Sequence, residues 1–179
     1  TGVQTCALPI YASGRDTFLA SRFGIKQRSA KHNSAALFGH FSGAKRLSGH
    51  AEGNISVFWF DHGWFWFIPL SDGATSVGAV CWPDYLKTRK SSPERFFLQT
   101  IELCPQLEDR LRDARLISPV SATGNYSYDT ERAGGKQYIM LGDAYAFIDP
   151  VFSTGVYLAM HSAFVGAETV DICLDYPDR

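Results

Sequence analysis

The middle of the chain is dominated by β-branched and aromatic residues, in runs that two short polar turns interrupt. The runs cover residues 55–60, 64–70 and 74–80, and the turn sequences are Asp61-His62-Gly63 and Ser71-Asp72-Gly73. Turns rich in Asp and Gly join antiparallel neighbours. The pattern therefore predicts an antiparallel meander of three strands.

Helical patterns precede and follow these strands. A short helix is predicted over residues 17–23, with Gly24 as its C-terminal cap. Ser92-Pro93 is a helix start, and Pro105 breaks or kinks the apolar periodicity that follows. The last long helix is predicted over residues 155–174. Extended segments are predicted over residues 34–42, 124–129 and 137–141, and an exposed loop over residues 45–53.

Residues 150–167 form an uncharged stretch that is long enough for a membrane span. Their Ser, Thr, Tyr, His and Gly content is too polar for one, and we predict a helix buried inside a globular protein instead.

Composition narrows the function classes. The 179 residues are 45% hydrophobic with a net charge of −1, and no basic run follows a phosphate backbone, which argues against a nucleic-acid partner. The four cysteines are widely spaced, so we expect a reducing cytoplasm rather than a disulfide framework. The five histidines are scattered without metal-ligand spacing, and no metal site is predicted.

The segment from Leu141 to Gly155 carries the most chemical information. An apolar strand ends in Gly142-Asp143, where a ligand can approach the backbone and the carboxylate can accept hydrogen bonds from hydroxyl groups. Asp149-Pro150 then precedes a helix, and we expect free amides at Ser153, Thr154 and Gly155 to stabilise an anion or an electron-rich ring. The alternative is an ordinary strand-to-helix turn with an Asp cap.

This segment resembles the second FAD-binding motif of flavoprotein monooxygenases and, more closely, of flavin-dependent halogenases. The resemblance implies that Asp143 binds the ribityl chain and that residues 150–155 lie beneath the isoalloxazine ring. Ala12-Ser13-Gly14-Arg15-Asp16 resembles the end of a second element of these flavoproteins. The cofactor-binding residues that the resemblance implies are Gly14, Arg15, Gly142, Asp143, Ala144, Asp149, Pro150, Ser153, Thr154 and Gly155.

A second motif points to halogenation. Residues 63–70 contain W-x-W-x-I-P, a signature associated with flavin-dependent halogenases, and strand alternation places Trp64, Trp66 and Ile68 on one face. The resemblance implies a dry substrate channel, and the alternative is an aromatic strand that serves only as core. The channel residues that we predict are Trp64, Trp66, Ile68, Pro69 and Phe152.

Three further expectations follow from the same resemblance. Thr154 and Gly155 match the position at which the family holds a halide. Phe152 stands where tryptophan-type halogenases carry a Glu, which suggests a phenol, a pyrrole or a carrier-bound aromatic as substrate. The catalytic Lys of the family lies upstream of the segment that matches, so the catalytic residue of this chain is unknown.

The beginning of the chain suggests a fragment. Residues 1–10 resemble a translated sequencing adapter, and the sequence contains no G-x-G-x-x-G dinucleotide fingerprint. We expect a mixed α/β fold, in which a partial Rossmann-like FAD-binding domain (residues 11–36 and 119–179) carries an inserted antiparallel substrate domain (residues 37–118).

The expected function is that of an FAD-dependent oxidoreductase that halogenates an electron-rich aromatic. The resemblance implies a flavin hydroperoxide, a hypohalous species and a separate flavin reductase. The alternatives are an aromatic hydroxylase or a reductase of the same fold, or an inactive fragment that does not hold FAD.

Overall fold

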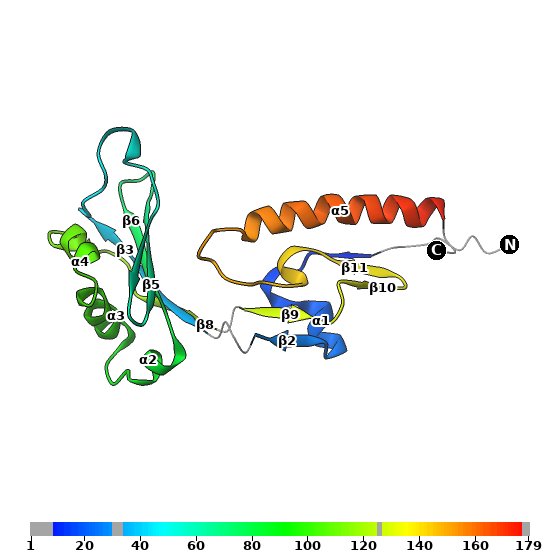
Figure 1. Cartoon of the computed structure of the whole chain (residues 1–179), viewed down its shortest axis with the longest axis horizontal. Helices are drawn as coiled ribbons and strands as arrows, with labels where there is room; N and C mark the ends of the chain where they lie inside the picture. The colour runs from blue at the N-terminus through cyan, green and yellow to red at the C-terminus, as the bar shows by residue number, and fades with distance from the viewer. Residues whose placement is uncertain (1–8, 30–33, 125–126, 177–179) are drawn as a thin grey trace. The chain divides into compact units, whose positions relative to one another are not determined.

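The computed structural model describes residues 9–29, 34–124 and 127–176, and the chain divides into two compact units. Unit 1 comprises residues 1–32 and 126–179, and unit 2 comprises residues 33–125. Unit 2 is therefore an insertion between two segments of unit 1 (Figure 1). The predicted mixed α/β class with an inserted antiparallel sheet is confirmed.

Unit 2 is built on one antiparallel sheet. Its strands lie in the order β4-β5-β6-β3-β7, and β8 also pairs with β3. The predicted meander corresponds to β4, β5 and β6, and β3 pairs with β6 from Ala35 to Phe41. The strands are β3 (Ala35–Ser42), β4 (Ser56–Phe60), β5 (Gly63–Pro69), β6 (Thr75–Cys81), β7 (Arg115–Leu116) and β8 (Ser121–Gly124).

Helices α3 (Pro93–Glu102) and α4 (Pro105–Leu111) cover one face of this sheet (Figure 1). The Oγ atom of Ser92 accepts a hydrogen bond from the Arg95 amide at 3.2 Å, which is the predicted cap. The chain leaves the helical path before Pro105 because proline cannot supply an amide to the helix ladder. A short helix α2 (Pro83–Lys87) and a 3₁₀ turn η2 (Gly49–Ala51) were not predicted.

Alternation along β5 separates two sets of aromatic side chains. Phe65 and Phe67 are fully buried in the core beneath the helices. Trp64 and Trp66 lie on the opposite face, as the two-residue period predicts.

Unit 1 combines short strands with one long helix. The parallel pair β1–β11 matches Ile10 with Ile139, and β10 extends it on the other side. A small core contains Leu19, Ile25 and Met140. The elements are β1 (Ile10–Tyr11), η1 (Gly14–Asp16), α1 (Phe18–Phe23), β2 (Lys26–Arg28), β9 (Tyr128–Thr130), β10 (Gly134–Gly135), β11 (Tyr138–Met140), η3 (Gly142–Ala144) and α5 (Gly155–Asp175).

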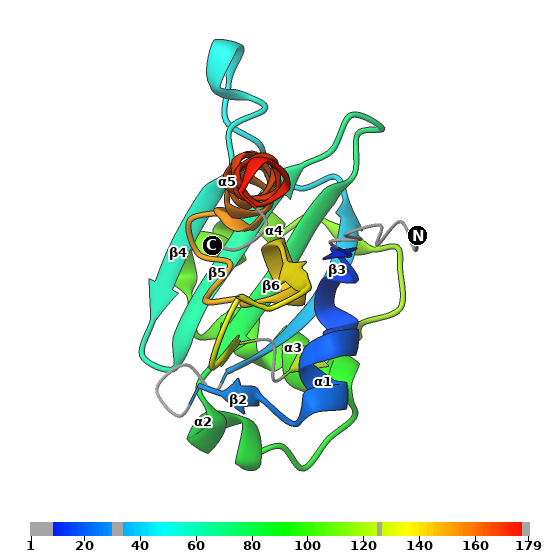
Figure 2. The ribbon, with the colours of Figure 1, turned by 90° about the vertical axis from the view of Figure 1, so that its right-hand side faces the viewer.

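The long helix α5 begins and ends close to its predicted bounds, but its predicted burial is wrong. Gly166 is its only buried residue within the part of the chain that the structure describes. Phe164 is 70% exposed and Val156 is 72% exposed. Apolar composition suggested a helix surrounded by protein, whereas α5 contacts η3 through one narrow stripe of small residues; Figure 2 looks down this helix. No described helix is both long and apolar enough to cross a membrane.

Candidate functional site

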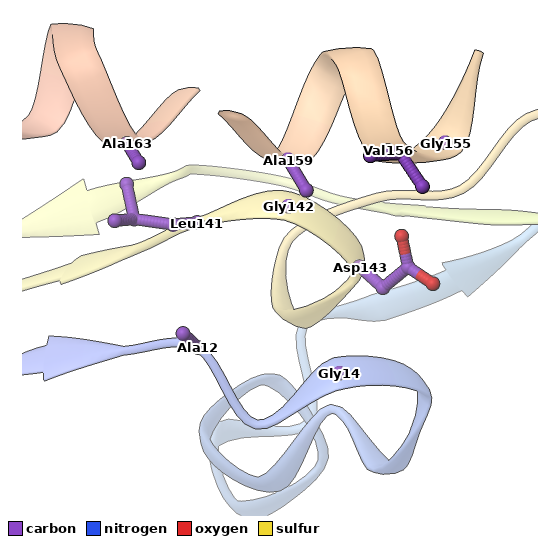
Figure 3. A pocket seen from close by; sticks show the side chains of 9 residues that line it. All are labelled: Ala12, Gly14, Leu141, Gly142, Asp143, Gly155, Val156, Ala159 and Ala163. Carbon is purple, nitrogen blue, oxygen red and sulfur yellow. The ribbon is translucent and has the colours of Figure 1, made fainter. Parts of the chain in front are cut away.

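Unit 1 contains a cavity of about 420 Å³ at the start of α5. Residues from three parts of unit 1 line it: the loop at η1, the end of β11 with η3, and the first nine residues of α5 (Figure 3). Most of the lining is glycine, alanine or backbone, so a ligand can lie against the main chain. The lining residues are Ala12, Gly14, Leu141, Gly142, Asp143, Gly155, Val156, Ala159 and Ala163.

Gly142 closes the cavity on the η3 side, and two observations require a glycine there. Its φ is +54°, in the left-handed region. A Cβ at this position would also lie 3.0 Å from the Cβ of Ala159 on α5. The helix therefore lies so close to the backbone of η3 that a side chain at residue 142 would force Ala159 to shift by a few tenths of an ångström.

A hydroxyl group links η3 to the same helix. The Gly142 amide donates a hydrogen bond to Oγ of Ser162 at 2.9 Å, and Ser162 donates to the Ala159 carbonyl at 2.9 Å. One turn further along, Gly166 packs against the side chain of Leu141. These contacts hold the segment that carries Asp143 in place against α5.

Asp143 supplies the carboxylate of the cavity. Its side chain projects between the Gly14 loop and the first turn of α5 (Figure 3). Its backbone carbonyl accepts a hydrogen bond from the hydroxyl of Tyr128 at 2.6 Å. Burial, with a smaller contribution from the nearby Asp143 charge, raises the pKa of Tyr128 to about 12, so this phenol stays protonated and keeps donating at neutral pH.

The turn before α5 differs in detail from the prediction. Oδ1 of Asp149 accepts a hydrogen bond from the Val151 amide at 2.9 Å, which makes Asp149 a turn-forming residue. The Ser153 amide donates to the Pro150 carbonyl at 2.9 Å, so the prediction of a free amide at Ser153 is wrong. A tight turn, with φ of +52° at Ser153, uses this donor before the helix begins.

Free amides are also found at the start of α5 itself. The helix begins at Gly155, and its first internal bond runs from the Leu158 amide to the Thr154 carbonyl at 2.9 Å. The amides of Gly155 and Val156, both cavity-lining residues, precede this bond and have no carbonyl partner in the helix. Such amides, together with the helix dipole, favour an anion or an electron-rich group.

The predicted cofactor residues therefore fall into three groups. Gly14, Gly142, Asp143 and Gly155 meet at the cavity. Ala144 is 1% exposed and belongs to the small core of unit 1. The remaining predicted residues are not among those that line the cavity within the described chain; they are Arg15, Asp149, Pro150, Ser153 and Thr154.

The small residues through which α5 contacts η3 and β11 were not predicted. Ala159, Ser162 and Gly166 recur at spacings of three and four, which places small residues on one face of a helix. That spacing could have indicated close packing, but only the structure shows that the face contacts residues 139–142.

The predicted channel residues lie in different units. Trp64, Trp66, Ile68 and Pro69 all belong to β5 of unit 2. Phe152 belongs to unit 1, in the turn before α5, and is 83% exposed.

Comparison with known proteins gives one family. The family model described as tryptophan halogenase matches residues 42–169. A tryptophan 2-halogenase from Chondromyces crocatus is 34% identical over 89% of this chain and 31% of its own length. A 1H-pyrrole-2-carbonyl-[peptidyl-carrier protein] chlorinase from Pseudomonas fluorescens is 29% identical over 87% of this chain and 36% of its own length.

A solved structure agrees with these relatives. The myxobacterial chondrochloren halogenase CndH, described as a variant of FAD-dependent halogenases, superposes with a TM-score of 0.83 and 35% identity. The match covers 93% of this chain and 39% of that one. The chain spans about a third of the length of the curated relatives it matches. Since the family model covers well over half of its residues, the chain belongs to the tryptophan halogenase family of flavin-dependent enzymes.

Proposed function

We propose that this chain is part of an FAD-dependent halogenase that modifies an electron-rich aromatic compound. The observation that carries the proposal is the cavity of unit 1, where Gly14, Gly142, Asp143 and the start of α5 meet. The W-x-W-x-I-P strand of unit 2 supports the same activity.

The residues present at the cavity fit part of an FAD molecule. Its volume lies within the range of about 300–1,000 Å³ that small-molecule sites occupy. A Cβ built at Gly14 meets no atom within 4 Å, so backbone faces open space there. The Asp143 carboxylate suits the hydroxyl groups of a ribityl chain, and the amides at the start of α5 suit the electron-rich edge of the ring.

Four of the predicted residues receive a role on this basis. Asp143 accepts hydrogen bonds from the ribityl hydroxyls, and Gly142 lets the cofactor approach the main chain. Thr154 and Gly155, at the junction of turn and helix, hold the halide through backbone donors. Reduced FAD, once bound, would supply two of the four electrons that reduce oxygen, and the halide would supply the other two as it is oxidised to the halogenating agent.

The aromatic face of β5 supports a water-poor route for that agent. Trp64 is 3% exposed, and Trp66 lies beside it with ring centroids 6.2 Å apart. Two adjacent indoles exclude water, and exclusion of water protects a reactive species from hydrolysis. Phe152 favours a phenol, a pyrrole or a carrier-bound aromatic, since it offers no carboxylate to an indole nitrogen.

Partners and location follow from the same proposal. The enzyme takes reduced flavin from a separate reductase and uses chloride or bromide. A carrier-bound substrate is supported by the pyrrole-carrier chlorinase among the relatives. We place the protein in a reducing cytoplasm, which the buried free thiols of Cys81 and Cys104 support.

The test uses the full-length enzyme with a flavin reductase, FAD, bromide and phenol, and mass spectrometry of the products. Bromophenol is the expected product. A hydroxylated product would favour an aromatic hydroxylase of the same fold, and no FAD binding by the full-length protein would refute the cofactor site.

A carboxylate variant tests the ribityl role directly. Asp143→Asn is expected to weaken FAD binding by roughly 10- to 100-fold, the loss of one or two charge-assisted hydrogen bonds. Asp129→Asn is the matched control, because Asp129 is an exposed carboxylate on β9 that does not line the cavity. Equal FAD affinities for the two variants, measured by flavin fluorescence, would remove Asp143 from the site.

A further inference from the structure

In unit 2, the indole ring of Trp66 lies directly over the backbone of Gly78. The two residues are paired across β5 and β6, and Gly78 is paired in turn with Phe38 on β3. A Cβ at residue 78 would lie 2.2 Å from Cζ2 of Trp66 and 2.4 Å from Cε2. Real Cβ atoms essentially never approach so closely, so any side chain at this position would displace the ring.

The indole is also held at its edges. Its Nε1 donates a hydrogen bond to Oγ of Ser76 at 3.2 Å. The ring of Phe38 lies 5.9 Å away with a 41° tilt, and that of Trp64 lies 6.2 Å away with a 55° tilt. A bicyclic ring with contacts on these sides moves as a whole, because it has no flexible end that could bend aside.

The bare backbone at Gly78 therefore sets how deeply the indole sits on the sheet. To reach ordinary contact with a Cβ, which begins at 3.4 Å, the ring would have to rise by more than an ångström. That movement would lengthen and weaken the bond to Ser76, which is already 3.2 Å long, and disturb the packing with Phe38.

We propose that Gly78 is a positioning residue that determines aromatic specificity through Trp66. This inference rests on the proposed function, in which Trp66 lines the substrate channel. The glycine keeps the indole low on the sheet, and the height of the indole then sets the width of that channel. A larger residue at position 78 would lift the indole off the sheet and reduce the size of aromatic ring that the channel accepts.

The same sheet provides a matched control at Gly39 of β3. A Cβ at Gly39 would lie 2.8 Å from Cδ1 of Leu116, the flexible end of an aliphatic side chain. Gly39 is paired with Val77, which belongs to the core beneath the helices. Gly39→Ala therefore adds the same methyl group to the same sheet on the face that carries no indole.

The first experiment measures hydrogen exchange of the tryptophan Nε1–H groups by NMR in this chain. Gly78→Ala is expected to accelerate exchange at Trp66 by roughly 2- to 10-fold, the loss of one hydrogen bond. Ser76→Ala removes the hydrogen-bond acceptor without adding an atom beneath the indole, and it should give a similar acceleration. Gly39→Ala should leave the rate at Trp66 unchanged. Unchanged exchange at Trp66 in Gly78→Ala would overturn the inference.

A variant that fails to fold still gives a decision. Trp66→Leu combined with Gly78→Ala removes the ring that the new methyl group meets. Recovery of folding in the double variant supports the close contact between the Trp66 ring and residue 78, and failure to recover overturns it.

The second experiment measures bromination of phenol and of the larger bicyclic phenol 1-naphthol by the full-length enzyme. Gly78→Ala is expected to lower kcat/KM for 1-naphthol by roughly 10- to 100-fold, the effect of about an ångström of misplacement. The loss for phenol should be smaller, and FAD affinity should not change. Equal losses for both rings would overturn the specificity role. A wild-type enzyme that brominates neither compound would refute the proposed function, while the exchange result decides the position of the indole independently.

Discussion

The contact between η3 and α5 gives the sharpest test of the cavity. Gly142→Ala introduces two separate costs. A non-glycine residue with left-handed φ costs about 1–2 kcal/mol, and φ at Gly142 is +54°. The added Cβ would also lie 3.0 Å from the Cβ of Ala159, and overpacking of this kind costs about 1–3 kcal/mol. Together the variant should lose about 2–5 kcal/mol of unfolding free energy.

Gly14→Ala separates these two costs. Gly14 lines the same cavity and has a φ of +64°, but a Cβ there meets no atom within 4 Å. It should lose only about 1–2 kcal/mol, the conformational cost. The difference in unfolding free energy between the two variants is therefore the cost of the contact with Ala159. Ala159→Gly should recover part of that free energy in the Gly142→Ala background.

The assay can follow each unit by itself. All four tryptophans, Trp59, Trp64, Trp66 and Trp82, belong to unit 2. The longest helix, α5, belongs to unit 1. Urea unfolding followed by circular dichroism at 222 nm should shift for Gly142→Ala, while the tryptophan fluorescence transition should stay in place. If Gly142→Ala is no less stable than Gly14→Ala, the close approach of α5 to η3 is refuted.

Three further predictions concern the same fold. Ser162→Ala should lower the stability of unit 1 by about 1–3 kcal/mol, because the Gly142 amide loses its acceptor; native-state exchange at that amide would show no change if the bond did not exist. The pKa of Tyr128 is raised to about 12, so the stability it contributes is complete below pH 10 and is lost as pH rises toward 12; Tyr128→Phe should flatten stability against pH in this window, and an unchanged alkaline transition would contradict the assignment. Burial raises the pKa of Cys81 to about 12, whereas Cys173 is partly exposed. Iodoacetamide should therefore modify Cys173 before Cys81, which peptide mass spectrometry would detect, and equal modification of the two would contradict the burial of Cys81.

Local chemistry explains which parts of the fold were predictable. Ser92-Pro93 and Pro105 mark helix ends through their own hydrogen-bonding limits, and the structure places helix boundaries at both. The turns around β5 depend on short Asp-Gly sequences in the same way. Gly142 and Asp143 were predicted as ligand contacts because the whole run from Leu141 to Gly155 resembles a known motif, and both residues line the cavity.

Contacts between distant segments explain what could not be predicted. The burial of α5 depends on what surrounds it, and composition alone gave the wrong answer for Phe164. The Ser153 amide is used by a turn whose geometry no local pattern specifies. Gly78 looks like any glycine in a strand until the pairing of β5 with β6 places an indole over it.

The insertion of unit 2 also has a consequence for the order of folding. Ala35 near the start of the insertion is paired with Gly124 near its end. Once that pair forms, the loop that must close to pair Ile10 with Ile139 shortens from about 130 residues to about 40, which lowers the entropic cost of closure by about 1 kcal/mol. The parallel pairing of Ile10 with Ile139 should therefore follow the insertion in refolding, with the fluorescence phase ahead of the helical phase. A helical phase that comes first would show that unit 1 folds before unit 2 has formed.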